Sequence, residues 1–401
     1  MAKNEGINGP LSGIVCLDLT RILAGPFCTR ILADLGALVI KIEPPGGDPT
    51  RAFGSRLIGK EPEGRDVNSS YFANVNAGKR TITLDLKREK DMGILLKLIS
   101  KADVLVENFR PGVMKRLGLD WPTLHRKHPS LIMASISGFG QNGPKAHLKA
   151  MDSIIQASSG IMSVTSTENG GIPTRCGVSI SDVMAGIFAA NGIQAALLGR
   201  QRSTDYGGSY VDISMLDASV AAASVQLSSY GASGNIPVPI GNKNPVVSPF
   251  DSFRCSDEKY VMVTSGTDMF EKLCHAIERP HLAKDPRFRS NYSRLQNNNA
   301  LSLALENAFR QRPAHEWVAL LQSREIPVAI VASIDDVARD EQVEARRMAI
   351  RTIDSKWLCA GNPIKIDRWP DTNLKSRPNP PRLDEDRESI LRFAEKGRSK
   401  L

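Results

Sequence analysis

Several features are scarce or missing in this 401-residue chain, and each absence argues against a class of protein. Aromatic residues make up only 5%, and the six cysteines form no CxxC pair. No uninterrupted apolar run reaches the roughly 18 residues of a membrane span. We therefore expect a soluble protein with reduced, mostly buried thiols, no disulfide framework and no cysteine-rich zinc site. The first ten residues resemble neither a secretory signal nor a transit peptide, which predicts a cytoplasmic location.

The net charge is +9, but it is not arranged as in a nucleic-acid-binding protein. Lysine and arginine are spread along the chain, and no helix-turn-helix, ribonucleoprotein or zinc-finger signature is present. We therefore expect no nucleic-acid partner and no membrane partner. A small ligand that carries phosphate accounts for the basic excess as well as a solvated basic surface does.

Two familiar motifs are present but lack the context that their function needs, and a third is absent. Residues 138–143 match GxGxxG after an expected strand, but Pro144 follows at once and no helix opens inside the motif, which indicates a loop. His125 and His128 form an HxxH pair without a third ligand, so we expect surface histidines and no metal site. A serine hydrolase is unsupported because the chain contains no GxSxG sequence.

The order of hydrophobic segments predicts an α/β protein, with a βαβ fold and a mainly parallel sheet in a large domain and a smaller α+β domain after it. The large domain is expected over 1–227, the small domain with its linkers over 228–325, and a return to the large domain with a wrapping tail over 326–401. Residues 44–80 are polar and rich in Gly and Pro, which indicates a surface excursion. Expected strands are 14–18, 38–42, 81–86, 104–107, 131–137, 211–215, a segment near Phe253 and 260–264, and expected helices are 24–35, 91–99, 152–159, 182–198, 216–227, 267–277, 299–311 and 314–323.

Two aspartates begin apolar helices about 30 residues apart. Asp182 precedes a long run of small apolar residues, where backbone amides and the helix dipole favour an anion. Asp152 begins a similar helix. Each residue is by pattern alone either a helix cap or a carboxylate available for nucleophilic or acid–base chemistry.

Seven segments then show a family resemblance. They are residues 17–26 (LDLTRILAGP), 32–43 (LADLGALVIKIE), 47–51 (GDPTR), 76–80 (NAGKR), 106–112 (VENFRPG), 137–144 (SGFGQNGP) and 177–182 (GVSISD). Their order and spacing resemble the family III CoA-transferases of the CaiB/BaiF type, which include formyl-CoA and carnitine CoA-transferases. The resemblance covers nearly the whole chain.

The resemblance implies an intertwined homodimer, in which each chain has a large Rossmann-like domain and a smaller domain. It also implies activity on an acyl-CoA and a small carboxylic acid without a tightly bound cofactor. It implies that Asp182 is the nucleophile, with Asp152 in a supporting role. Positions that touch coenzyme A in the family fall on Arg21, Ile22, Ala24, Leu84, Lys87, Asn108, Phe109, Arg116 and Lys149. A carboxylate with an ordinary pKa of about 4 is ionised at neutral pH, so we expect Asp182 to need no general base.

Two alternatives remain at this level. The α-methylacyl-CoA racemases share the fold and use a histidine before the position of Asp152, but here that neighbour is Met151, which cannot carry a proton. A non-catalytic acyl-CoA binding protein is the other alternative. Leu23, Pro44 and the glycine-poor segment 241–245 depart from the formyl-CoA transferases, so we expect a different acid substrate.

Overall fold

The chain forms two compact units, each built from separate stretches of sequence. A computed structural model describes residues 8–53, 69–167, 170–202 and 207–396. The larger unit comprises Met1–Ile161, Arg175–Ser233 and Asp340–Leu401, and the smaller comprises Met162–Thr174 and Gly234–Arg339. The smaller unit thus extends past the expected boundary at 325, because a strand at Val328–Ile330 pairs within it.

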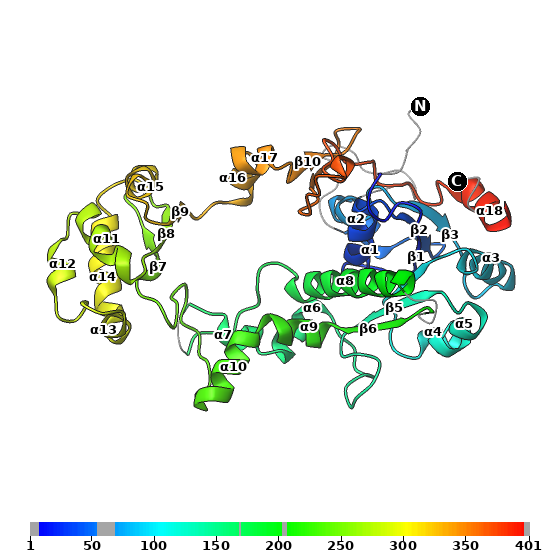
Figure 1. Ribbon diagram of the computed structural model, residues 1–401, viewed down its shortest axis with the longest axis horizontal. Helices are drawn as coiled ribbons and strands as arrows, with labels where there is room; N and C mark the ends of the chain where they lie inside the picture. The colour runs from blue at the N-terminus through cyan, green and yellow to red at the C-terminus, as the bar shows by residue number, and fades with distance from the viewer. Residues whose placement is uncertain (1–7, 54–68, 168–169, 203–206, 397–401) are drawn as a thin grey trace. The chain divides into compact units, whose positions relative to one another are not determined.

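A six-stranded parallel sheet forms the centre of the larger unit, as the resemblance implies (Figure 1). Its spatial order is β3-β2-β1-β4-β5-β6. The order reverses between β1 and β4, and open α/β sheets bind ligands outside the carboxyl ends of the strands at such a point. The strands are β1 (Val15–Asp18), β2 (Leu38–Glu43), β3 (Arg80–Thr83), β4 (Val104–Glu107), β5 (Ile132–Ser137) and β6 (Tyr210–Ser214).

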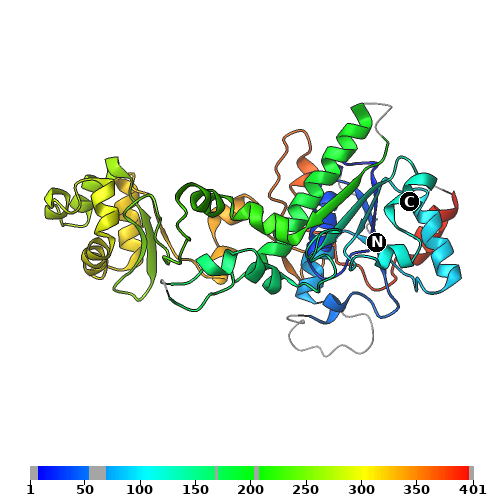
Figure 2. The ribbon, with the colours of Figure 1, turned by 90° about the horizontal axis from the view of Figure 1, so that it is seen from below.

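Alternation along each strand divides the interior of the larger unit between the two faces of the sheet. Cys16, Val104 and Val106 face one core, and Leu17 and Leu105 face the other. Figures 1 and 2 show α1 and α8 side by side on the first face, with α3, α5 and α18 on the opposite side. The helices of the larger unit are α1 (Ala24–Asp34), α2 (Ser70–Asn76), α3 (Glu89–Ile99), α4 (Val113–Arg116), α5 (Trp121–Lys127), α6 (Asp152–Ser158), α8 (Ile180–Arg202), α9 (Met215–Ala222), α10 (Ser224–Ser233), α17 (Glu341–Ala345) and α18 (Arg387–Lys396). Helix α16 (Ile334–Ala338) belongs to the smaller unit.

Helix α8 packs directly on α1 through small residues. A Cβ atom added to Gly186 would lie 2.8 Å from the carbonyl oxygen of Ala24, so only glycine fits at this crossing. By length and composition alone α8 could also cross a membrane. The expectation from the sequence did not include it because that expectation considered uninterrupted apolar runs, and α8 mixes apolar with small polar residues. Its buried face belongs to the core of the larger unit.

The smaller unit is α+β, as expected. A three-stranded antiparallel sheet, ordered β7-β8-β9, packs against helices around one apolar core. Its elements are α7 (Ile161–Val164), β7 (Phe250–Arg254), β8 (Tyr260–Thr264), β9 (Val328–Ile330), α11 (Phe270–Ala276), α12 (His281–Lys284), α13 (Asn291–Gln296), α14 (Asn298–Phe309) and α15 (Ala314–Ser323).

Two segments differ from the sequence expectations. The expected excursion over 44–80 contains α2, whose Phe72 is fully buried and whose first turn is capped by Ser69; residues 54–68 lie outside the described residues. The expected linker from 228 begins as the last turns of α10, because Ser and Gly cost a helix no more than about 1 kcal/mol per residue.

In the returning segment, β10 (Ala349–Arg351) pairs with β11 (Leu358–Ala360), and buried Arg377 forms an ion pair with Asp34 of α1.

The cysteines agree with the expectation from the sequence. All six are free thiols; five are buried and Cys176 is half-buried.

Candidate active site

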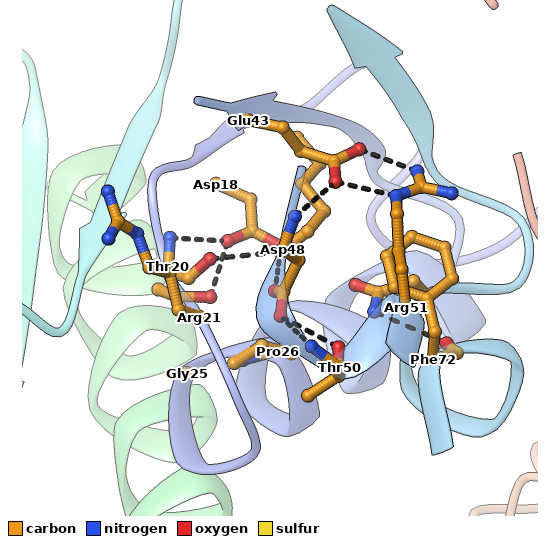
Figure 3. Close-up of polar contacts among 12 residues, drawn as sticks. Asp18, Thr20, Arg21, Gly25, Pro26, Glu43, Asp48, Thr50, Arg51 and Phe72 are labelled. Atoms are coloured by element: carbon orange, nitrogen blue, oxygen red, sulfur yellow. Dashed lines mark hydrogen bonds and ion pairs between the residues drawn. The ribbon is translucent and has the colours of Figure 1, made fainter. Parts of the chain in front are cut away.

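The turn between β1 and α1 lies on a buried cluster of charged side chains (Figure 3). Asp18 accepts hydrogen bonds from the Thr20 backbone amide at 2.9 Å and from Thr29 Oγ1 at 2.7 Å, and it forms an ion pair with Lys79 at 2.9 Å. Lys41 Nζ donates to the Thr20 carbonyl at 2.9 Å. Burial opposes ionisation of Asp18, but Lys79 and Lys41 outweigh it and hold its pKa well below the ordinary value. The cluster therefore holds the backbone of Thr20, and with it the turn between β1 and α1, in place.

The same cluster continues along β2 into the loop that follows it. Lys41 forms a buried ion pair with Asp48, and Glu43 forms one with Arg51 at 2.7 Å. The Arg51 guanidinium also lies 3.8 Å from the centre of the Phe72 ring in α2. The sequence reasoning did not identify this network, although its members lie in the segments 32–43 and 47–51 that carried the resemblance.

Arg21 is held at the point where the strand order reverses. Its backbone amide donates to Asn108 Oδ1 and its carbonyl accepts from Asn108 Nδ2, both at 2.8 Å. The Arg21 guanidinium lies 5.2 Å from the centre of the Phe109 ring and points away from the buried cluster (Figure 3). The Phe109 amide in turn donates to Glu107, whose pKa burial raises to about 7. The structure thus brings together three of the expected coenzyme A positions.

Ile22 adopts a backbone conformation that β-branched residues avoid. Its φ is +69°, in the left-handed region, which is strained for an isoleucine. Such strain persists only where the surroundings enforce it, and it gathers at functional sites. Here the hydrogen bonds to Thr20 and Arg21 hold the residues before Ile22, and α1 begins two residues after it.

Asp182 lies in the first turn of α8, where that helix meets the start of α1. The backbone amide of Ala24, the first residue of α1, lies near its carboxylate. Burial raises its pKa, the nearby charge of Asp152 raises it further, and the Ala24 amide lowers it in part, which leaves a pKa of about 7. The expectation of an ordinary, fully ionised aspartate is therefore corrected: desolvation disfavours the charged form.

Asp152 lies beside Asp182 and acts as a remote cap of the same helix. Its Oδ1 accepts a hydrogen bond from the Ser181 backbone amide at 3.0 Å, one residue before Asp182. Its Oδ2 accepts from Gln156 Nε2 at 2.7 Å. Although the two aspartates are 30 residues apart in the sequence, α6 thus contacts the start of α8 directly.

Tyr71 is a site residue that the sequence reasoning missed. It is half-buried in α2, and burial together with the negative charges of Asp182, Asp48 and Asp152 raises its pKa to about 12. Its phenol therefore remains protonated at neutral pH near both aspartates and is available as a hydrogen-bond donor. The available signal was the helix-capping pattern at Ser69, within the segment assigned to the surface.

The other expected coenzyme A positions are more scattered. Leu84 is buried after β3, whereas Lys87, Arg116 and Lys149 are exposed, and in the described part of the chain no hydrogen bond or ion pair joins these cations to Asp182. Among the described residues, neither these three nor Arg21 has an acidic partner within 4.0 Å. They follow β3, β4, β5 and β1, respectively, after the carboxyl ends of the strands.

The alternatives to such a site have little structural support. Residues 138–143 form a loop after β5 with no helix at its end. His125 stacks on Trp121, and the part of the chain that the structure describes contains no group of three metal-binding side chains. Met151 is 68% exposed and caps α6 without a side-chain hydrogen bond.

Comparison with known proteins agrees with this geometry. Residues 11–387 match the model of CoA-transferase family III. The chain is 44% identical to an acetyl-CoA:oxalate CoA-transferase of Acetobacter aceti, over 94% of each chain. It is 34% identical to a succinate–glutarate CoA-transferase of Agrobacterium fabrum, over 85% of this chain and 84% of that protein.

Solved structures show the same relationship at the level of the fold. A CaiB/BaiF family protein from Brucella suis superposes with a TM-score of 0.86 at 35% identity, covering 96% of this chain and 100% of that one. The sequence match extends across both units. The chain therefore belongs to CoA-transferase family III and is an enzyme of that family.

Proposed function

We propose that this enzyme transfers coenzyme A from an acyl-CoA to a small dicarboxylic acid, with Asp182 as the covalent nucleophile. The observation that carries the proposal is the position of the Asp182 carboxylate, in the first turn of α8 and near the first amide of α1. Two helix N-termini therefore meet at one carboxylate, and helix N-termini favour negative charge. A developing oxyanion on the substrate would meet the same field.

The transfer needs no net proton movement. The Asp182 carboxylate attacks the thioester carbonyl, the C–S bond breaks, and the coenzyme A thiolate leaves, so that the acyl group and Asp182 form a mixed anhydride. The thiolate then attacks the Asp182 acyl carbon, which releases the donor acid and forms an aspartyl-CoA thioester. The acceptor carboxylate attacks this thioester and expels the thiolate again, and the thiolate finally attacks the acceptor carbonyl of the new anhydride. Asp182 is regenerated and the acceptor leaves as its coenzyme A thioester.

The raised pKa of Asp182 is consistent with this role. At pKa of about 7, both protonation states are present near neutral pH, and the ionised form is the nucleophile. A desolvated carboxylate also attacks without first losing a full hydration shell. Burial thus lowers the population of the reactive form and increases the reactivity of each ionised group.

We assign the coenzyme A site to the carboxyl end of the sheet around Arg21, Asn108 and Phe109. The paired Asn108 bonds fix Arg21, the Phe109 ring can pack on the adenine, and cations without acidic partners can meet phosphates. Ala24 presents its backbone amide near Asp182, and Ile22 lies in the turn just before Ala24. Leu84, Lys87, Arg116 and Lys149 complete the proposed contacts.

The acid substrate is assigned by class. The chain is similar to transferases whose names contain oxalate and glutarate, both dicarboxylates. A second carboxylate on the acceptor also suits a chain with a net charge of +9. A screen of oxalate, succinate, glutarate and mesaconate against acetyl-CoA and succinyl-CoA, with mass detection of the new thioester, identifies the pair.

We further propose that the enzyme is a homodimer, as the family resemblance implies, and large apolar side chains on α8 and α10 that are exposed in the single chain support this. Phe188, Leu198, Val225 and Leu227 are between 38% and 72% exposed. Exposed apolar side chains are commonly covered at protein interfaces. Light scattering should give twice the chain mass, and Leu227→Glu should reduce it; a monomeric wild-type protein refutes the proposal.

Asp182→Ala tests the nucleophile. The variant should lose transfer and the hydroxylamine-trapped adduct at residue 182 while it still binds acyl-CoA. Asp367→Asn is the matched control, because Asp367 is exposed and bonds only to the adjacent backbone amide. Undiminished transfer in Asp182→Ala refutes the assignment. Exchange of the α-proton of a branched acyl-CoA without transfer would instead show racemase chemistry, and binding without either reaction would show a binding protein.

A further inference from the structure

Gln156 is a fully buried polar residue of α6 that the chemistry above does not use. Its Oε1 accepts a hydrogen bond from the Cys176 backbone amide at 2.8 Å, and its Nε2 donates to Asp152 Oδ2 at 2.7 Å and to the Val178 carbonyl at 3.4 Å. The amide orientation is fixed because Cys176 N–H can only donate and a carboxylate can only accept. Every polar atom of the side chain therefore contacts the approach to Asp182 or its neighbour.

These contacts hold a segment that has little other support. Gly177 and Val178 are exposed, and within 176–181 the local backbone bond runs from the Ile180 amide to the Val178 carbonyl. Gln156 holds the segment at Cys176 and Val178. Asp152, which Gln156 orients, holds its end at the Ser181 amide.

We propose that Gln156 is a positioning residue for the nucleophile, acting through Asp152 and the 176–181 segment. This inference rests on the proposed role of Asp182. The Gln156 amide selects one rotamer of Asp152, so that Asp152 Oδ1 caps α8 at Ser181 and its charge stays beside Asp182. Nucleophilic attack requires a fixed geometry, and a displacement of about 1 Å can cost about 100-fold in rate.

Two substitutions separate the hydrogen bonds from simple packing. Gln156→Met keeps the side-chain volume but removes every bond, so it leaves Asp152 Oδ2 and the Cys176 amide without this partner in a partly buried site. Gln156→Glu keeps an acceptor for the Cys176 amide but replaces the donor to Asp152 with a second carboxyl group. That group reproduces the donor only while it is protonated, because two adjacent carboxylates resist joint ionisation.

Steady-state kinetics across pH 6 to 9 test the proposal, with variant folding checked by circular dichroism. For Gln156→Met we expect kcat to fall about 10- to 100-fold with KM for acyl-CoA within about threefold. Gln156→Glu should show a bell-shaped profile that loses activity as pH rises, where the wild type reaches a plateau. Gln194→Met is the matched control, because within the described parts of the chain the side chain of Gln194 in α8 bonds only to a carbonyl of its own helix, and its loss should leave kcat unchanged.

The outcomes separate this inference from the proposed function. If Asp182→Ala is inactive but Gln156→Met matches the wild type, the positioning role is refuted and the nucleophile stands. If Asp182→Ala remains active, the proposed function fails instead. Should Gln156→Met not fold, Gln156→Glu decides: a constant activity ratio to the wild type at every pH overturns the inference, and a bell-shaped profile supports it.

Discussion

The pKa of Asp182 leads to the sharpest prediction about this enzyme. The difference between the ordinary value of 3.8 and about 7 corresponds to roughly 4 kcal/mol in favour of the neutral carboxyl group. Because the nucleophile is the ionised form, activity should fall as pH drops below about 7. At pH 5 only about one hundredth of Asp182 is ionised, so kcat/KM should lie about 100-fold below its plateau.

The assay is kcat/KM for thioester transfer between pH 4.5 and 9, since this parameter reports ionisation of the free enzyme. Asp152→Asn should move the midpoint to lower pH because it removes a like charge beside Asp182. Burial is the larger cause, so the midpoint should remain above 3.8. Asp367→Asn should leave the profile unchanged. A wild-type midpoint below about 5 would show that the Asp182 carboxylate is solvated and would refute the reasoning.

Three further predictions concern the surroundings of the site. Gly186→Ala should destabilise the protein by about 1–3 kcal/mol in thermal unfolding and lower kcat, since the added Cβ atom meets the Ala24 carbonyl. The control is Gly199→Ala on the same helix, whose added Cβ atom meets no neighbouring atom, so this variant should be neutral or stabilising. Lys79→Met should cost roughly 3–5 kcal/mol in chemical denaturation, because Asp18 is left as an unpaired buried charge. Arg21→Ala should raise KM for acyl-CoA while kcat stays within about twofold, and the effect should shrink with added salt.

Much of the fold followed from local sequence patterns. The strands β1, β2, β4 and β5 lie within a residue or two of their expected ranges, because buried parallel strands are short, continuous apolar runs. Helix α8 was likewise expected, although it begins two residues before Asp182. In contrast, α2 was missed because its helical signal is brief and depends on burial of Phe72 against the rest of the larger unit.

By itself the sequence determined the parallel α/β architecture, the family resemblance and Asp182 as a candidate nucleophile, since these depend on periodicity and on residue types in order along the chain. Tertiary structure decided the chemical state of Asp182, because its pKa depends on burial and on Asp152, which is close in space and distant in sequence. The same is true of Gln156, whose side chain bonds to Asp152 within α6 and to Cys176 and Val178 in the segment before α8. Electrostatic and hydrogen-bond energies depend on distance and solvation, and only the folded chain sets either.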